Sequence, residues 1–157
     1  MRSLLKGAAA LAILSALSGC SLWQKAEVPL QKPAPTTLDI SVIASETKTP
    51  VAVHFFALES DEKFKKLDYF ELMKKLRRKK SIDIEAHSKE ILLPGEMAKR
   101  SIRLDDDVHY YAVVVGFKNV EDNDNWRFIQ RIVPHKNNDI TLILEEASMR
   151  KISNKGE

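Results

Sequence analysis

The sequence predicts a mainly β protein, an antiparallel β-sandwich with a small helical insertion between its second and third strands. Two observations carry this prediction. After residue 37, apolar and polar residues alternate with a period of two in most segments, and turn-forming residues separate those segments. One stretch near residue 70 has a helical period instead. The composition, 44% hydrophobic and 30% charged over 157 residues, is that of a single globular domain.

Seven segments are expected to form strands. The first shows the pattern clearly, because Leu38, Ile40 and Val42 alternate with polar residues, as in a strand buried on one face. The run from Tyr110 to Phe117 is almost entirely apolar and rich in valine, which indicates a central strand covered on both faces. The expected strands are residues 38–42, 51–57, 91–93, 100–104, 110–117, 126–132 and 140–144, with residues 81–86 as a candidate eighth.

A helical insert is expected over about residues 60–80. Apolar residues recur at every third position from Phe64 to Leu76, which is the spacing of one helix face. Ser60 is a candidate N-cap, and Asp68 with Glu71 three residues later has the pattern of a capping box. The insert is therefore either two short helices or one helix broken near Asp68.

The first nineteen residues have the features of a secretory signal peptide. Arg2 and Lys6 give a positive start, and nine of the ten residues from 8 to 17 are apolar. This run is shorter than the roughly 20 apolar residues that a membrane span needs. The sequence Leu17-Ser18-Gly19-Cys20 resembles the lipobox of bacterial lipoproteins. That resemblance implies cleavage between Gly19 and Cys20, and N-acyl and S-diacylglycerol groups on Cys20.

The chain after the signal peptide divides into a tether, a domain and a short tail. Residues 20–37 hold the lipidated cysteine and three prolines, Pro29, Pro33 and Pro35, and they are expected to be extended. The sandwich domain is expected over residues 38–150 and a tail over 151–157. Removal of residues 1–19 lowers the formal charge from +3 to +1, because Arg2 and Lys6 leave. A nearly neutral domain does not indicate nucleic-acid binding.

No catalytic group or metal site is predicted. The single cysteine is assigned to the lipid, and the sequence has neither a glycine-rich phosphate loop nor a G-x-S-x-G elbow. The histidines are scattered, without the spacing of metal ligands. They are His54, His87, His109 and His135. We therefore expect no cofactor beyond the covalent lipid, no metal and no small-molecule substrate.

The most lopsided charge feature lies at the end of the expected helical insert. Six of the seven residues from Lys74 to Lys80 are basic. Such a run could contact acidic lipid head groups or an acidic protein surface. It could also be a solvated helix end whose cations complement the helix dipole, which is the commoner case.

The order of these features resembles the outer-membrane lipoprotein family of type VI secretion systems called TssJ or SciN. The lipobox and tether precede two strands, a helical insert and the turn Leu93-Pro94-Gly95-Glu96. Further along, the run from Tyr110 to Asn119, the pair Trp126-Arg127 and the Asn137-Asn138 turn are also similar to the family. The resemblance covers about residues 38–145. Ser21, rather than aspartate, follows Cys20, which by the sorting rule of such lipoproteins implies the outer membrane.

This resemblance implies a transthyretin-like sandwich that is not an enzyme and is lipid-anchored on the periplasmic face of the outer membrane. Family members bind the periplasmic C-terminal region of the inner-membrane protein TssM, which works with TssL. Their contact lies largely in the loop between the first two strands, which is shorter here than is usual in the family. The corresponding residues are Ser45, Glu46, Thr47, Lys48, Thr49 and Pro50.

Two other functions remain open from the residues alone. A periplasmic ligand-binding lipoprotein would need a cavity, which Trp126, Tyr110 and Tyr111 could line. A transthyretin-like hydrolase would need clustered histidines, which their positions in the sequence do not indicate.

Overall fold

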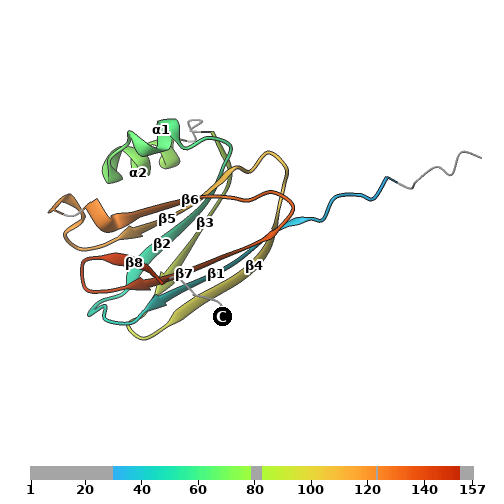
Figure 1. Cartoon of the computed structure of the whole chain (residues 1–157). Coiled ribbons are helices and arrows are strands. Elements are labelled where there is room, and N and C mark those ends of the chain that lie inside the picture. Colours follow the sequence, from blue (N-terminus) through green and yellow to red (C-terminus); the bar gives the residue numbers. More distant parts are fainter. Residues whose placement is uncertain (1–29, 79–82, 123, 153–157) are drawn as a thin grey trace, which may run out of the picture. The chain divides into compact units, whose positions relative to one another are not determined.

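The computed structural model describes residues 30–78, 83–122 and 124–152, and in them eight strands form a two-layered sandwich (Figure 1). The sheets run β4-β1-β7-β8 and β3-β2-β5-β6. The mainly β sandwich predicted from the sequence is confirmed. The strands are β1 (Thr36–Ala44), β2 (Val51–Leu58), β3 (Ile84–Leu92), β4 (Met97–Leu104), β5 (Tyr110–Gly116), β6 (Arg127–Arg131), β7 (Asn137–Leu144) and β8 (Met149–Ile152).

One strand pair departs from the antiparallel arrangement. β1 and β7 are parallel, with Ile40 opposite Ile140, whereas all other paired strands are antiparallel. The reason is the path of the chain, in which each strand runs opposite to the one before it. All odd-numbered strands therefore point the same way, and two of them become neighbours in the first sheet.

The core lies between the sheets and continues beneath the helices. β1 buries every second residue, as its alternation predicts. β2 and β5 are buried on both faces, because one face packs on the opposite sheet and the other lies under the helical insert. Phe56 of β2 packs edge-on against Phe64 of the insert, with ring centroids 5.1 Å apart. The central-strand prediction for residues 110–117 is therefore confirmed.

β3 is longer than the expected strand at residues 91–93. It begins at Ile84, so it also takes in part of the candidate strand at 81–86. Its inward positions were not recognised because Ser88 and Glu90 are polar. Both accept hydrogen bonds from Arg100 of β4, at 2.6 and 2.9 Å. The Arg100 guanidinium also lies 4.2 Å from the centroid of the Phe55 ring, so a charged side chain closes this edge of the sandwich.

Two boundaries differ from the expected ones. β1 already begins at Thr36, within the expected tether, and β8 reaches Ile152, beyond the expected domain end at residue 150. β8 was not predicted because it is a four-residue edge strand with Arg150 and Lys151 at its centre. Such a strand carries almost no hydrophobic pattern.

The helical insert contains α1 (Glu62–Lys65) and α2 (Tyr69–Arg77). The predicted capping box is confirmed: the Asp68 carboxylate accepts from Glu71 N at 2.7 Å, and the Glu71 carboxylate accepts from Asp68 N at 3.3 Å. The N-cap of α1 is Asp61 rather than Ser60. Both helices lie over the outer face of the second sheet (Figure 1). No helix among the described residues is long and apolar enough to cross a membrane.

The strand directions define two ends of the sandwich. At what we call the entry end, β1 begins at Thr36 and the connections 105–109 and 132–136 lie close by. At the opposite end, which we call the loop end, lie the connections 45–50, 93–96, 117–126 and 145–148. β1 has nine residues, which at about 3.3 Å each separates the two ends by roughly 30 Å.

Candidate interaction surface

The predicted partner loop, residues 45–50, lies at the loop end. Glu46 N donates to Leu144 O at 3.2 Å, so the loop starts against the end of β7. Lys48 Nζ lies 2.7 Å from a carboxylate oxygen of Glu146, which links the loop to the β7–β8 turn. Both of these side chains are exposed. The pair therefore holds the loop only weakly, since exposed ion pairs contribute about 0–1 kcal/mol.

Thr47 is the one buried residue of this loop. Its side chain is 6% exposed, and its hydroxyl has no hydrogen-bond partner among the described residues. An unpaired buried hydroxyl costs about 1–3 kcal/mol. Beside it lies a hollow of about 310 Å³ between the loop, the start of the β5–β6 connection and the β7–β8 turn, where Lys118 and Glu146 lie on its rim. The loop is thus packed with a polar group left unsatisfied.

The β3–β4 turn, residues 93–96, lies directly beside this loop and connects the two sheets. Gly95 N donates to Ala44 O at 2.7 Å, and Ala44 N donates to Glu96 O at 2.8 Å, so the turn is fastened to the end of β1. Gly95 has a φ of +87°, which L-residues rarely adopt, and this explains the glycine of the Pro94-Gly95 turn. The β3–β4 turn therefore extends the surface formed by residues 45–50.

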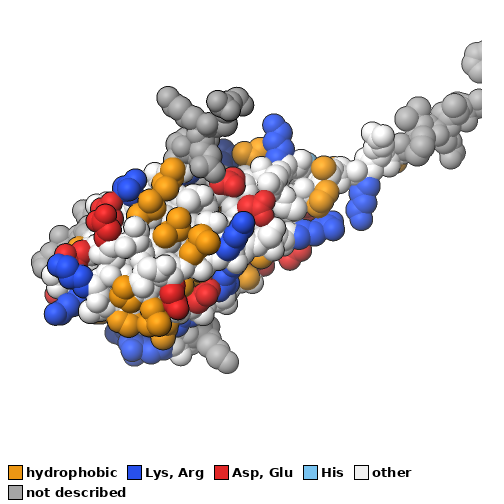
Figure 2. Space-filling model, turned by 90° about the horizontal axis from the view of Figure 1, so that it is seen from below, with side chains coloured by type: hydrophobic (Ala, Val, Ile, Leu, Met, Phe, Trp, Pro, Cys, Tyr) orange, Lys and Arg blue, Asp and Glu red, His pale blue; other side chains and the backbone are white. Residues whose placement is uncertain are grey.

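Exposed apolar side chains lie in and after this turn. Leu93 is 50% and Met97 55% exposed, whereas Ile91 of β3, 60% exposed, pairs with Ala52 and lies on the outer face of the second sheet. The strand register sets Met97 opposite Ile43, and Ile43 opposite Ile143, so an apolar row crosses three neighbouring strands. Figure 2 views this outer face of the first sheet, where hydrophobic side chains gather towards the left, at the loop end. Contiguous exposed apolar surface is typical of interaction sites.

The same face is polar at the entry end. Asp39 accepts hydrogen bonds from Ser101 Oγ at 2.5 Å and from Asn137 Nδ2 at 2.9 Å. These two contacts lower the pKa of the Asp39 carboxyl. Asn138 is buried and pairs both ends of its amide, with Oδ1 accepting from Val133 N at 2.8 Å and Nδ2 donating to three backbone carbonyls. Polar groups at this end are satisfied by the protein itself.

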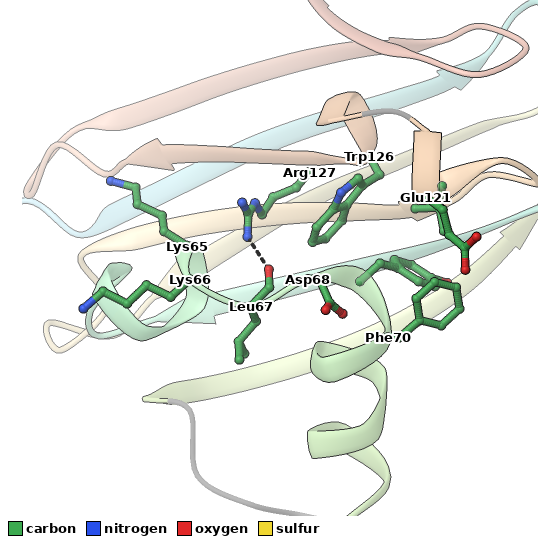
Figure 3. Close-up of a pocket in the computed structure, with 10 residues that line it drawn as sticks. Lys65, Lys66, Leu67, Asp68, Phe70, Glu121, Trp126 and Arg127 are labelled. Atoms are coloured by element: carbon green, nitrogen blue, oxygen red, sulfur yellow. Dashed lines mark hydrogen bonds between the residues drawn. The ribbon is translucent and has the colours of Figure 1, made fainter.

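A groove of about 660 Å³ separates the helical insert from the β5–β6 connection (Figure 3). Its polar groups already serve the fold. Arg127 donates to the carbonyls of Phe64 and Leu67 at 3.0 and 2.9 Å, and its guanidinium lies 4.7 Å from the centroid of the Trp126 ring. Asp68 caps α2. The groove is large, but Arg127 and Asp68 in its lining already bind backbone groups of the protein itself.

The same region explains Gly116. A Cβ at this position would lie 2.6 Å from the hydroxyl oxygen of Tyr69, closer than such atoms approach. Tyr69 also packs edge-on against Trp126, with ring centroids 5.6 Å apart. The insert can thus approach the end of β5 only because residue 116 has no side chain.

The histidines are less scattered than their sequence positions indicate. His54 Nδ1 lies 3.0 Å from His87 Nε2 on the outer face of the second sheet. Burial, then the neighbouring charges of His87 and Lys89, lower the pKa of His54 to about 4. The pair has no third ligand, and no group of three or more metal-binding side chains occurs among the described residues. Sequence reasoning missed the pair because it arises from a diagonal between neighbouring strands.

The other predicted site residues fall in different places. Gly19 and Cys20 lie outside the described residues, as do Lys79 and Lys80 of the basic run. Tyr111 is buried and borders a smaller cavity between the sheets, of about 260 Å³, whereas Trp126 borders the groove. The three aromatic residues considered for a ligand cavity therefore do not line one site. Sequence reasoning did not identify the exposed apolar side chains near the β3–β4 turn, although two leucines directly before Pro94-Gly95 could have indicated them.

Comparison with known proteins agrees with this fold. A family model described as type VI secretion lipoprotein (VasD, EvfM, TssJ; SciN) matches residues 37–147. No curated protein sequence matches the chain.

Solved structures also resemble it. The T6SS lipoprotein TssJ1 from Pseudomonas aeruginosa superposes with a TM-score of 0.70 at 18% identity, over 78% of this chain and 99% of that one. Serratia marcescens Lip, a membrane-bound component of the type VI secretion system, gives 0.68 at 15%, over 76% and 99%. A chain of a structure named for the TssM C-terminal domain from EAEC gives 0.61 at 20%, over 75% and 98%. At these identities the likeness shows the fold.

Proposed function

The chain belongs to the type VI secretion lipoprotein family, and from that premise we propose that it is a structural adaptor of the secretion membrane complex. The adaptor is anchored by lipid at the periplasmic face of the outer membrane. It binds the periplasmic C-terminal region of TssM, which works with TssL. The proposed function is non-enzymatic.

One observation carries the partner half of this proposal: the loop end combines exposed apolar side chains with an incompletely satisfied loop. Leu93 and Met97 lie in and just after the β3–β4 turn, and the buried hydroxyl of Thr47 in the adjacent loop has no hydrogen-bond partner in the described part of the chain. Burying apolar area of this kind contributes about 25 cal/mol per Å². The binding surface we propose therefore includes residues 45–50, as the family resemblance implies, together with the β3–β4 turn and Met97.

The anchor half rests on the amino-terminal sequence. Cys20 carries N-acyl and S-diacylglycerol groups in this proposal, and each buried methylene contributes about 0.8 kcal/mol to membrane binding. Residues 21–36 connect the lipid to β1, and as an extended segment they would span up to roughly 50 Å. Because β1 starts at the entry end, the tether and the proposed partner surface are at opposite ends of a strand. That arrangement suits a bridge between two membranes.

Binding is tested with the soluble chain from Ser21 onward and a folded TssM periplasmic C-terminal fragment. Isothermal titration calorimetry should give a Kd between nanomolar and micromolar. If both proteins are folded and no binding is detected, the proposed function is wrong.

The surface is tested with matched variants. Leu93→Glu with Met97→Glu should weaken binding at least tenfold, because each charge would have to be desolvated in an apolar contact. Val133→Glu is the control, since Val133 is equally exposed but lies at the entry end, and its affinity should stay unchanged. Glu46→Ala with Lys48→Ala should lower affinity less. Equal effects of the Leu93→Glu, Met97→Glu variant and the control would show that the interface lies elsewhere.

The anchor is tested by mass spectrometry and membrane fractionation. The mature protein should begin at Cys20 with acyl groups attached, and it should fractionate with outer membranes. Cys20→Ser should release the protein into the periplasm. A chain that keeps residues 1–19, or that fractionates with inner membranes, would contradict this part of the proposal.

The groove beside Trp126 is the observation in favour of the other function, small-ligand binding. We place it second because Arg127 and Asp68 are already bound by backbone groups. A metabolite that raises the melting temperature, and loses this effect in Trp126→Ala, would reverse the order of the two functions.

A further inference from the structure

We propose that the outer stripe of α2 is a docking surface for anionic phospholipid head groups of the membrane that anchors the chain. We call this stripe the basic face; it consists of Lys74, Lys75, Arg77 and Arg78, with Phe70 one helical turn before Lys74. The inference deepens the proposed lipid anchoring, because it rests on that membrane lying within reach of the tether.

The orientation of α2 follows from its buried side. Leu72 is fully buried, and Met73 and Leu76 pack against the core, so this side faces the second sheet. Phe70, Lys74 and Arg77 are four and three positions apart, which places them together along one side of the helix, and all three are exposed. The insert itself covers the outer face of that sheet (Figure 1), so the sheet does not cover this side of the helix.

The cations of the basic face take no part in the ion pairs of the described residues. The ion pairs of the insert use Lys63 with Asp83 and Lys65 with Asp61. No ion pair among the described residues involves any of the four cations of α2. The acidic residues of α2 and its cap, Asp68 and Glu71, are at its first turn and bond to each other's backbone amides. Positive charge is thus separated onto the last two turns of the helix.

A second observation distinguishes lipid from solvent as the occupant. Phe70 is 53% exposed on the same stripe as the cations. Its ring packs edge-on against Tyr69 at 5.5 Å between centroids and lies at the edge of the groove beside Glu121 (Figure 3), so it is only partly covered by the protein. An aromatic side chain next to a group of cations is the composition of helices that lie at a membrane interface. A helix end that merely faces water needs no such residue.

The position of the basic face also fits a membrane contact. α2 returns the chain to Asp83, whose carbonyl oxygen accepts from Glu59 N at 3.1 Å, next to the end of β2 at the entry end. α2 begins at the loop end, where Tyr69 lies against Gly116, and docking through it would leave the outer face of the first sheet, with Ile43 and Met97, free. Lipid and TssM contacts would then be compatible in one molecule.

The test uses the lipid-free chain from Ser21 onward, so that acyl groups do not contribute. All eight strands and the helical insert lie within residues 33–152, which form one compact unit with its own core, so this part folds without the tether. We expect it to cosediment with vesicles of phosphatidylethanolamine and phosphatidylglycerol at low salt. It should not cosediment with pure phosphatidylcholine vesicles, and binding should fall as salt rises.

Charge reversal gives the decisive comparison. Changing the four cations of the basic face to glutamate should lower the vesicle partition coefficient at least tenfold, and Phe70→Ser should lower it a few-fold. The matched control changes four exposed cations elsewhere to glutamate, with the same change in net charge, and should lose much less. The control positions are Lys89, Lys99, Arg103 and Lys136. Circular dichroism and melting temperature verify that each variant is folded.

The outcomes separate this inference from the proposed function. Absence of binding to anionic vesicles, or equal losses in the two four-fold variants, would overturn the lipid contact and leave TssM binding untouched. If reversal of the basic face abolished TssM binding but not vesicle binding, the face would instead meet an acidic protein surface, and the lipid proposal would be wrong. Retained vesicle binding by a chain that fails to bind TssM would leave the lipid proposal standing.

Discussion

The two ends of the sandwich differ in how far their polar groups are paired and their apolar side chains are buried. At the entry end, Asn138 and its neighbours satisfy their polar groups with one another, and Val133 is the exposed aliphatic side chain. At the loop end, Leu93 and Met97 are exposed in and after the β3–β4 turn, and the buried hydroxyl of Thr47 finds no hydrogen-bond partner among the described residues. The entry end is complete as a free-standing structure, whereas the loop end carries costs that a binding partner could remove.

The entry end should respond most strongly to loss of its central amide. Asn138→Ala removes a buried side chain that forms four hydrogen bonds, and we expect it to lower the free energy of unfolding by about 3 kcal/mol. Urea denaturation measures the change, and TssM affinity of the folded protein should be unaffected. Asn137→Ala is the control, because that side chain is exposed, and it should cost under about 1 kcal/mol. Similar losses in both would refute the special role of Asn138.

Between pH 6.5 and 4, acid should act most strongly on the outer face of the second sheet. The pKa of His54 falls from 6.5 in the unfolded chain to about 4 in the folded protein, mainly because of burial. Between these values the unfolded state binds more protons, so stability is full above pH 6.5 and is lost as pH falls to 4. The loss should be on the order of 2–3 kcal/mol.

This pH effect is isolated by comparing variants. His54→Leu should flatten the dependence of the unfolding free energy between pH 6.5 and 4, whereas His109→Leu, at an exposed site, should keep it. The pH dependence of the unfolding free energy in Asn138→Ala, and in the Leu93→Glu, Met97→Glu variant, should match that of the wild type. A His54→Leu protein with an unchanged slope would show that another group is responsible.

The unsatisfied loop should become more stable when its hydroxyl is removed. Thr47→Val replaces the hydroxyl with a methyl group of the same shape, and we expect a gain of about 1 kcal/mol in the free energy of unfolding. Thr47→Ser, which keeps the hydroxyl and deletes the methyl group, should lose stability. If the hydroxyl pairs in the complex, Thr47→Val should also weaken TssM binding. Destabilisation by valine would mean that the hydroxyl is paired in solution.

The smallest effect is expected for the exposed clasp of the same loop. Removing either side of the Lys48–Glu146 pair should change the free energy of unfolding by at most about 0.5 kcal/mol, because both groups are solvated. Thermal melts of Lys48→Ala and Glu146→Ala at low and high salt test this. A loss above 1 kcal/mol would show that the pair, rather than backbone contacts, fixes the loop.

The sequence by itself determined most of the fold. Alternation in residues 38–42 and the apolar run at 110–117 report directly which strand faces are buried, and those faces are the ones that the structure buries. The Asp68–Glu71 capping box is equally local, because its two partners are three residues apart. Such local patterns predict the structure correctly, because the residues that form the pattern are the same residues that interact in the fold.

Only the tertiary structure decided which distant segments meet. Ser88 and Glu90 are polar, yet they point inwards because Arg100 of the facing strand donates hydrogen bonds to both of them. The parallel pairing of β1 with β7, and the contact of His54 with His87, depend on which strands become neighbours. The same holds for the surface at the loop end, where the β3–β4 turn and the β1–β2 loop are distant in the sequence and are joined by the hydrogen bond from Gly95 to Ala44. Composition and periodicity describe one strand at a time, whereas a binding surface is a property of strands brought together.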